Sequence, residues 1–493
     1  MFIFRCQSTC TCGVLAAILA GGCAVGPDFK KPAPPQVGDY TTSPLSTTAA
    51  ATNVLGGEPQ RFLSGADLSG DWWTLFHSKA LNNLIDRALT NNPDLRAAQA
   101  ALVVAHEGVL VQRGAYMPAA NVGFGASRQK TPADLAPTPN SGALYFNLFT
   151  PQVNVSYTPD VFGLNRRTME TVKAQEEATR FALLATHITL TANLAEAAVQ
   201  EASLRAQVDA TRQILVVNSN MLSVLRAQFS KGYASRLEVA AQESQLAQVA
   251  ATLPPLLKQL AQQRDLLAAL SGGYPSQPMA EEFKLEDLRL PGDLPVSLPS
   301  KLVAQRPDVR QAEANLHGAS AQIGVAVANR LPNLMLSADA GSTALAAGSM
   351  FAGGTGFWTL AGNVTQPIFQ GGALLHKERA ARAAFVQASE QYRSTVVTAF
   401  QNVADSLVAL EQDGSALNAA AAARDAAKVT LDLTERQWKL GYASYLAILS
   451  AEQTYQQATI NLVQAQANRY GDTVALFQSL GGGWWNRPEF ARQ

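Results

Sequence analysis

The chain contains two copies of one unit, and this duplication constrains its fold more than any other feature. The letters GYAS occur at residues 232–235 and again, 209 positions later, at residues 441–444. The segments NPDLRAAQAAL and RPDVRQAEANL, which begin at Asn92 and Arg306, also match each other. The matched segments follow the same order in both halves. An internal repeat of this size predicts two-fold pseudosymmetry within the chain.

Each unit begins with a predicted helix that is followed by predicted strands. Pro93 and Pro307 stand at the first helical positions, and an aspartate follows each of them, as helix N-termini favour. Four later stretches have the two-residue period of strands. Their apolar positions are Val122, Phe124 and Ala126; Val153, Val155 and Tyr157; Leu334, Leu336 and Ala338; and Trp358, Leu360 and Val364. A half-buried sheet of a soluble domain fits this pattern, and so does a membrane barrel with a wet lumen.

Two long stretches without proline predict unusually long helices. Residues 164–231 also lack glycine, and residues 373–440 contain a single one. A helix over either stretch would be about 100 Å long at ~1.5 Å per residue, far beyond an ordinary globular helix. Leucines and valines between Leu204 and Leu225 follow spacings of three and four, interrupted by Thr211 and Asn218. We therefore expect these helices to pack against others in water as coiled coils.

The two GYAS motifs are expected at the tips of helical hairpins. Gly232 and Gly441 follow the last turn of each long helix, where a residue with positive φ is favoured. Ser235 can cap the returning helix, and Glu238 completes a capping box with it. Ser444 can also cap, but an alanine stands where its box partner would be. This structural role accounts for both motifs; a functional tip is the second interpretation.

The N-terminus has the features of an export signal. Arg5 precedes a short apolar run, residues 13–20, which suits a secretory signal better than a membrane span. The following letters LAGGC resemble a bacterial lipoprotein signal, which implies that Cys23 becomes the acylated first residue of the mature chain. Ordinary cleavage near Gly22 is the alternative. The other three cysteines precede Cys23, so the rest of the chain has no disulfide or cysteine metal site.

The composition and the motifs exclude several classes of function. Lys+Arg and Asp+Glu both number 38, so we expect no basic surface for nucleic acid. No segment after the signal has ~18 consecutive uncharged apolar residues, and we expect no transmembrane helix. The five histidines lack metal-ligand spacing, and no nucleophile elbow or phosphate-binding glycine loop occurs. We therefore expect neither an enzyme nor a cofactor, apart from a covalent lipid on Cys23.

Taken together, these segments resemble the TolC/OprM/NodT family of outer-membrane efflux proteins. The resemblance is carried by CAVGPDFKKP, DWWTLFHSKALNNLIDRALTNNPDL, PDVFGLNRR, the GYAS motifs and the closing LGGGWW. It implies a mainly α fold with a membrane β-barrel. In this fold, coiled-coil hairpins build an α-barrel, and four strands from each of three copies build a twelve-stranded barrel. Four strands cannot close a barrel alone, so an oligomer is also expected on physical grounds.

The predicted organisation has five parts. They are a lipoprotein signal peptide (1–22), an extended Pro/Thr-rich segment (23–70), a first efflux repeat (71–290), a second repeat (291–480) and a C-terminal tail (481–493).

The resemblance also implies a role for the hairpin tips. In that family the tips form the closed periplasmic end of the tunnel, where an adaptor docks and opens it. An acidic residue commonly lies on the returning helix of the second tip, and here Ser450 takes its place. Of the two tips, the first therefore keeps charged residues, Arg236 and Glu238. The tip and gate candidates are Gly232, Tyr233, Ser235, Arg236, Glu238, Gly441, Tyr442, Ser444 and Ser450.

The expected function is the passive exit duct of a tripartite pump that exports small molecules or drugs. The implied partners are two further copies of the chain, a periplasmic adaptor (membrane fusion) protein, an inner-membrane pump of the RND type, and outer-membrane lipid. The protein would lie in the outer membrane, lipid-anchored, and extend into the periplasm. Two alternatives stay open: the outlet of a type I protein secretion system, and a non-conducting coiled-coil lipoprotein tether.

Overall fold

The computed structural model describes residues 24–43, 45–132, 144–277 and 281–491. The predicted signal peptide and Cys23 lie outside these residues. The chain forms two compact units, each described here by itself. Unit 1 contains the described residues up to Lys31, together with Leu102–Thr179 and Ala312–Tyr392. Unit 2 contains Pro32–Ala101, Arg180–Gln311 and Arg393–Gln493.

Helices dominate the described residues. The elements in chain order are β1 (Arg61–Ser64), the 3-10 helix η1 (Trp72–Phe76), α2 (Lys79–Asn91), α3 (Pro93–Gly114), β2 (Ala119–Thr131), β3 (Leu144–Tyr157), α4 (Leu164–Ser230), α5 (Arg236–Leu270), η3 (Leu285–Asp287), β4 (Asp293–Val296), α6 (Pro299–Gln305), α7 (Pro307–Ala328), β5 (Asn333–Ser342), η4 (Ala347–Ser349), β6 (Gly356–Thr365), α8 (Ala373–Lys439), α9 (Tyr445–Ser479), η5 (Trp484–Asn486) and α10 (Pro488–Ala491).

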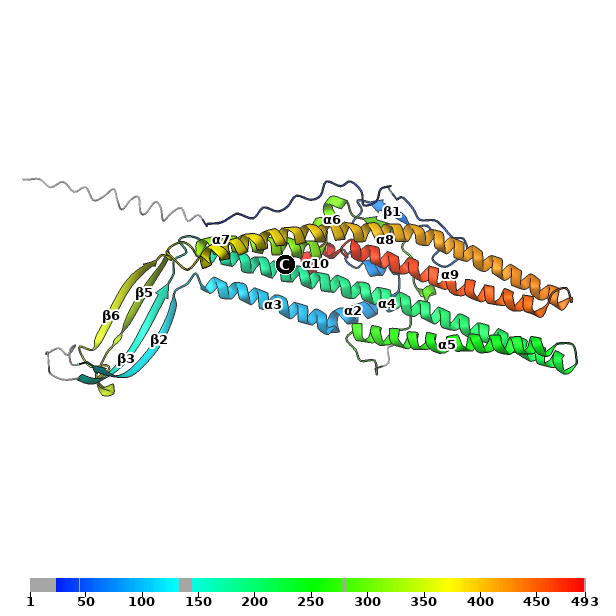
Figure 1. Cartoon of the computed structure of the whole chain (residues 1–493), viewed down its shortest axis with the longest axis horizontal. Coiled ribbons are helices and arrows are strands. Elements are labelled where there is room, and N and C mark those ends of the chain that lie inside the picture. The colour runs from blue at the N-terminus through cyan, green and yellow to red at the C-terminus, as the bar shows by residue number, and fades with distance from the viewer. Residues whose placement is uncertain (1–23, 44, 133–143, 278–280, 492–493) are drawn as a thin grey trace, which may run out of the picture. The chain divides into compact units, whose positions relative to one another are not determined.

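Unit 1 is built around one antiparallel sheet with the strand order β2-β3-β5-β6 (Figure 1). The hairpin β2–β3 comes from the first half of the chain, and β5–β6 comes from the second half. The pairing of β3 with β5 joins the two hairpins and sets Tyr157 opposite Leu336. The four strands predicted from alternating apolar residues are confirmed.

This sheet has one apolar and one polar face. The register aligns Val122, Val153 and Trp358 across the sheet on the same face, because side chains alternate along each strand. On the other face, Asn154 Nδ2 donates a hydrogen bond to Asp339 Oδ1 at 2.6 Å. Val122 is 85% exposed and Trp358 is 74% exposed. The apolar face is therefore not covered by the described part of the chain.

Unit 2 contains the turning ends of two long helical hairpins, α4–α5 and α8–α9, which turn at the same end of the unit (Figure 1). The helices α4 and α8 have 67 residues each, and α5 and α9 have 35 each. The two long helices predicted from the absence of proline are confirmed to within one residue at their C-termini. The long helices α4 and α8 each contribute residues to both units.

The helix α4 also tests the expectation that no helix crosses a membrane. It contains an 18-residue window with a mean hydropathy of 1.2, enough for a span by length and composition alone. However, 67% of that window is buried inside the structure, as in a core helix of a soluble protein. The absence of a transmembrane helix stays a prediction.

The motif DWWTLF, together with Leu480 of LGGGWW, forms part of the core of unit 2. Trp72 and Phe76 are buried, and the centroids of their rings lie 5.6 and 6.4 Å from the centroid of the Phe477 ring on α9. The C-terminal tail docks beside them, since Arg487 forms an ion pair with Asp71. This packing brings the beginning and the end of unit 2 together.

Candidate functional site

The two hairpin tips have the backbone geometry that the sequence predicts. Gly232 has a φ of +78° and Gly441 a φ of +80°. The N–H of Tyr233 donates to the carbonyl oxygen of Gln228, and the N–H of Gly232 donates to that of Phe229. This pair of bonds is the Schellman motif. The second tip has the same motif, because the N–H groups of Tyr442 and Gly441 donate to the carbonyl oxygens of Gln437 and Trp438. The predicted positive φ at both glycines is confirmed.

The caps of the two returning helices differ. The N–H of Glu238 donates to Ser235 Oγ at 3.3 Å, and the Ser235 N–H donates to the Glu238 carboxylate at 2.6 Å. This capping box is confirmed. Ser444 stands at the N-cap of α9, but its hydroxyl makes no capping hydrogen bond, so that expectation was wrong. The Ala447 N–H donates to the Ser444 carbonyl oxygen instead, and alanine has no side chain to complete a box.

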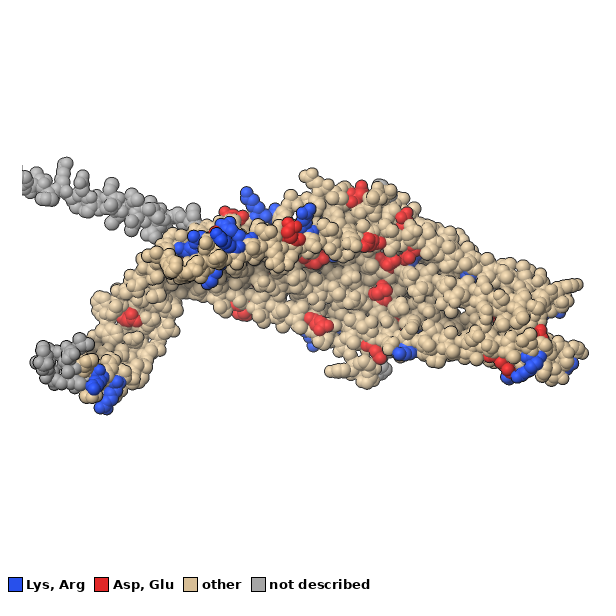
Figure 2. All heavy atoms as spheres, in the orientation of Figure 1, with Lys and Arg blue, Asp and Glu red and all other residues tan. Residues whose placement is uncertain are grey.

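The charged side chains of the first tip form a small group on the hairpin surface (Figure 2). Glu243 lies 2.9 Å from Arg226 and 4.0 Å from Arg236. The hydrogen bond from Arg226 is the main cause that lowers the pKa of Glu243. Glu238 is occupied by the capping box, so the candidates Arg236 and Glu238 do not pair with each other. Sequence reasoning missed Arg226 and Glu243, because their pairing depends on how α4 and α5 align.

The remaining tip candidates are exposed in the single chain. Tyr233 is 82% exposed and Tyr442 is 83% exposed. Ser450 is exposed too, and its carbonyl oxygen accepts a hydrogen bond from the Thr454 hydroxyl at 2.9 Å. The tips thus present two aromatic side chains that no other part of the described chain covers.

A buried polar chain connects the two hairpins behind the tips. The Tyr445 hydroxyl on α9 donates to Gln242 Oε1 on α5. Gln242 Nε2 donates in turn to the backbone oxygen and to Oδ1 of Asn218 on α4, at 2.9 and 3.0 Å. All three residues are buried. Asn218 had a visible signal, since it interrupts an apolar spacing; Gln242 and Tyr445 had none.

Apolar packing surrounds this polar chain. Leu222 and Leu225 of α4, Val239 of α5, and Ile448 of α9 form one buried cluster together with Tyr445. The ring of Trp438 on α8 also packs edge-on against Tyr445, at 6.1 Å between centroids. Residues of all four hairpin helices therefore meet in this cluster.

One carboxylate lies buried in this region without a hydrogen-bond partner. Glu452 on α9 is 3% exposed, and neither of its carboxylate oxygens is hydrogen-bonded within the described residues. Burial raises the pKa of Glu452 to about 7, and the negative charge of Glu435 on α8 adds to the effect. No pattern in the sequence marks this residue, because periodicity indicates the buried face of a helix but not whether a carboxylate on that face has a partner.

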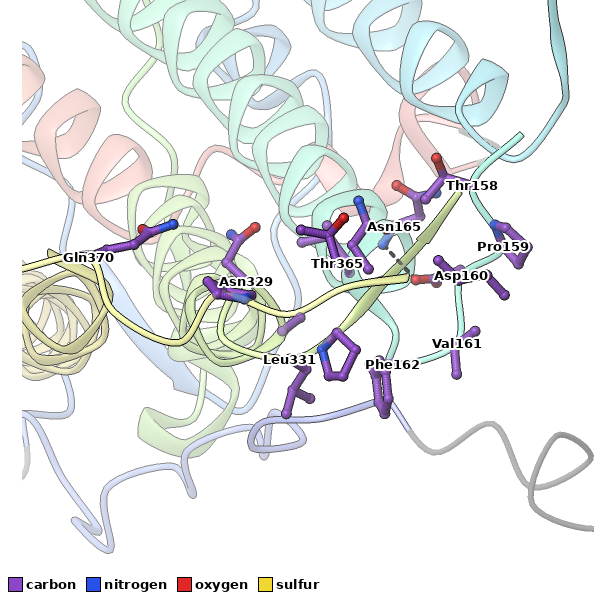
Figure 3. Close-up of a pocket in the computed structure, with 16 residues that line it drawn as sticks. Thr158, Pro159, Asp160, Val161, Phe162, Asn165, Asn329, Leu331, Thr365 and Gln370 are labelled. Carbon is purple, nitrogen blue, oxygen red and sulfur yellow. Dashed lines mark hydrogen bonds between the residues drawn. The ribbon is translucent and has the colours of Figure 1, made fainter. Parts of the chain in front are cut away.

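A second candidate site lies in unit 1, where strands end and helices begin. A cavity of about 410 Å³ opens there (Figure 3). Asp160 caps α4, because its carboxylate accepts from the N–H groups of Asn165 and Arg166 at 3.0 and 2.9 Å. Among the described residues, no group of three metal-ligating side chains occurs, here or elsewhere. The lining of the cavity also includes Thr158, Phe162, Asn329, Leu331, Thr365 and Gln370.

The first described residues are fixed beside this junction. The buried guanidinium of Arg167 donates to the carbonyl oxygens of Val25 and Gly26 at 2.9 and 3.3 Å, and to the Asp28 carboxylate at 2.8 Å. The Val25 N–H donates to the Phe162 carbonyl oxygen at 3.2 Å. The motif PDVFGLNRR thus caps α4 and holds the segment that directly follows Cys23.

Comparison with solved structures supports the fold. The outer-membrane channel OprN matches with a TM-score of 0.83, at 24% sequence identity, over 94% of this chain and 100% of that chain. The outer membrane protein VceC from Vibrio cholerae matches with a TM-score of 0.78, at 25% identity, over 85% of this chain and 100% of that chain.

Comparison with known sequences identifies the family. The toluene efflux pump outer membrane protein TtgF of Pseudomonas putida is 31% identical over 495 residues, which cover 96% of both chains. The pyoverdine export outer membrane protein OpmQ of Pseudomonas aeruginosa is 30% identical over 84% of this chain and 87% of its own length. The outer membrane efflux protein family matches residues 84–273 and 298–482. The chain therefore belongs to the outer membrane efflux protein family.

Proposed function

We propose that this chain is the outer-membrane exit duct of a tripartite efflux pump. The observation that carries the proposal is the combination of a two-faced sheet with long hairpins in one duplicated chain. A sheet with an exposed apolar face suits lipid on that side and water on the other. Hairpins of this length suit a conduit that extends through the periplasm.

The working form of the duct is a homotrimer. Within the described residues, β2 and β6 each pair on one side only. An open strand edge in a bilayer leaves backbone groups without hydrogen bonds, which is costly. Pairing of β2 in one copy with β6 in the next removes every edge, and three copies then build a barrel of twelve strands.

The partners of the duct are a periplasmic adaptor and an inner-membrane pump of the RND type. The exposed tyrosines at the hairpin tips support an adaptor contact there, since exposed aromatic side chains are enriched in interfaces. The substrates are small molecules. Relatives named for toluene, antibiotic and pyoverdine export support this class, and the pump selects among its members.

The anchor of the mature chain is a lipid on Cys23, which lies outside the described residues. Arg167 and Phe162 hold Val25 next to the end of the sheet, which supports an acyl group close to the membrane surface. Several acyl chains together with a barrel anchor a protein firmly, whereas one chain binds only marginally. Metabolic labelling with palmitate should mark the wild type and not Cys23→Ser, and Cys23→Ser should still reach the outer membrane. Labelling of Cys23→Ser would refute the assignment.

Conductance tests the central proposal. The purified protein in a planar lipid bilayer should give discrete ion-conducting steps, and a strain that lacks the gene should regain solvent or dye efflux when the gene is restored. A non-conducting tether would give no steps. The outlet of a protein secretion system would conduct, but it would restore export of a protein and not efflux of small molecules.

A further inference from the structure

We propose that the far end of the sheet binds the phosphorylated head group of a membrane lipid, through Arg128 and Lys130 of β2 and Tyr145 of β3. This inference rests on the proposed function, because it requires the apolar face of the sheet to lie in a bilayer. It adds a ligand and a site that neither the hairpins nor the tips involve.

The two cations lie on the apolar face. Arg128 and Lys130 are an even number of residues from Val122 and Phe124, and the ladder between β2 and β3 continues without a break from Ala119 to Thr131. Side chains two residues apart along a strand share a face. The lipid-facing surface of β2 is therefore apolar over its first half and cationic at its end.

The spacing along the sheet matches the thickness of a bilayer. Tyr157 ends β3 on the helix side, and Asn147, the partner of Arg128, lies ten residues before it on the same face. A tilted transmembrane strand needs about 9–11 residues to cross the hydrocarbon core. When Tyr157 lies at one interface, Arg128 and Lys130 lie at the other, at the depth of the lipid head groups.

The charges at this end are exposed and of one sign. Figure 2 shows basic side chains at the end of the sheet remote from the helices. Arg128 and Lys130 are exposed, and no ion pair involves either of them among the described residues. Asp339, the only carboxylate in β2, β3, β5 and β6, lies on the opposite face, where Asn154 binds it. Nothing described on the sheet neutralises the pair.

An aromatic ring completes the site. The Lys130 ammonium lies 5.4 Å from the centre of the Tyr145 ring, directly across the ladder. Tyrosines are enriched at membrane interfaces, where the ring contacts acyl chains and the hydroxyl reaches water. The cation–π contact holds the ammonium over the ring. The ligand is thus amphipathic: phosphate for the two cations, and acyl chains for the apolar face beside them.

A soluble anion would not use this arrangement. Phosphate in solution has no need of an apolar surface, whereas here the cations continue directly into Ala126 and Phe124 on the same face. Arginine pairs with phosphate through two parallel hydrogen bonds, and lysine adds a point charge. A glycolipid with two phosphates matches this pair better than a lipid with one.

Lipid retention by the purified protein tests the site. Full-length protein in neutral detergent is mixed with bisphosphorylated lipid A, and the bound lipid is counted by native mass spectrometry. Arg128→Gln with Lys130→Gln should weaken retention about tenfold or more, since each cation near a lipid surface contributes substantially. The matched control, Lys79→Gln with Lys301→Gln, removes two exposed cations from unit 2 and should bind like the wild type.

Two outcomes would overturn the inference. Equal retention by Arg128→Gln with Lys130→Gln and by the wild type would show that lipid binds elsewhere. Displacement of the lipid by inorganic phosphate alone would indicate a soluble-anion site. Conductance of the same preparations separates this test from the proposed function: a variant that loses lipid and still conducts supports both, and a wild type that does not conduct refutes the duct itself.

Discussion

Arg469 Nη2 donates a hydrogen bond to the Thr48 hydroxyl at 2.7 Å, although the two residues are 421 positions apart. The same guanidinium donates to the carbonyl oxygens of Gly56 and Glu58 at 2.6 and 2.8 Å. Arg469 is fully buried on α9. A buried cation is tolerated only when its donors are satisfied. Arg469 therefore fixes the path of the extended segment that precedes the first helix.

Replacement of Arg469 by methionine should release this segment. Thr48 and the two carbonyl oxygens would lose their donor, and a buried acceptor left without a donor costs about 1–3 kcal/mol. Limited proteolysis should cut between residues 48 and 60 in the variant. Its unfolding midpoint should lie at a lower denaturant concentration than that of the wild type. Arg436→Met, at an exposed position of α8, is the matched control. Equal protease resistance of both variants would contradict this role.

The glycines at the hairpin tips should tolerate asparagine better than valine. A Cβ added at Gly232 or Gly441 meets no atom within 4 Å, so only the positive φ opposes a side chain. Valine should cost about 1 kcal/mol or more at either position, because β-branched residues avoid this region. Asparagine enters it more readily and should cost less. Thermal unfolding of the four variants measures this order, and equal midpoints for valine and asparagine would contradict it.

Much of the fold could be predicted because its signals are local. Absence of proline gave the lengths of α4 and α8, and the period of two gave β2, β3, β5 and β6. The capping box at Ser235 was also readable, since its two residues are three positions apart. The same reasoning failed at Ser444, where the backbone alone closes the first turn. A cap is a preference of the residue type, and the local backbone can override it.

The contacts between hairpins could not be predicted. Tyr445 and Gln242 are 203 positions apart, and their hydrogen bond depends on how α9 lies against α5. Arg226 and Glu243 likewise meet only when α4 and α5 are in register. Periodicity gives the face of a helix that is buried, but not the residue that it meets. The position of the candidate residues at the hairpin tips could thus be predicted, whereas the buried polar chain behind them was missed.

Acid should loosen the C-terminal tail through His187. Burial, and then the charge of Arg487, lowers the pKa of His187 to about 4; Arg487 Nη1 lies 2.8 Å from its Nε2. A lowered pKa means that the neutral ring is favoured in the folded state. The contribution of the neutral His187 ring to folding stability is fully present above pH ~6.5 and is lost as the pH falls through about 4. The midpoint of thermal unfolding of the wild type should therefore fall as the pH is lowered over this interval.

The variant His187→Gln gives the control for this pH dependence. Glutamine offers an oxygen to Arg487 and does not titrate. The loss of stability between pH ~6.5 and 4 should therefore be smaller in His187→Gln by up to about 3 kcal/mol. Parallel pH profiles for the two proteins would show that other groups cause the acid sensitivity.

Glu452 should have the opposite pH dependence. Its pKa is raised to about 7, so the folded state favours the protonated acid. The contribution of the protonated Glu452 side chain to folding stability is fully present below pH ~4.5 and is lost as the pH rises through about 7. Glu452→Gln keeps the shape and removes the charge. The variant should match the wild type at pH 4 and should be more stable at pH 8, by about 1–3 kcal/mol. Thermal unfolding at both values measures this, and a variant that is less stable at pH 8 would contradict it.

The last prediction concerns the proposed resting gate. The buried cluster around Tyr445 joins the two hairpins within one chain, so we propose that closure between copies would depend on what the tips expose. At the first tip these groups are Arg236 and its neighbours, and at the second they are Tyr442 and Ser450, without a carboxylate. Exposed ion pairs contribute little each. Charges at the first tip would then be a weak latch that an adaptor can release.

Arg236→Ala with Glu238→Ala should raise single-channel conductance, or entry of vancomycin into cells, without loss of the trimer. Glu238 also caps α5, so Glu238→Ala alone is the control for a frayed helix start. Glu243→Gln tests the latch from the other side, because it discharges the partner of Arg226 and Arg236 while the capping box stays intact. A rise in both Glu243→Gln and the double variant, but not in Glu238→Ala, assigns closure to the charged group of the first tip. Wild-type conductance in every variant would leave closure to the apolar packing of Tyr233 and Tyr442.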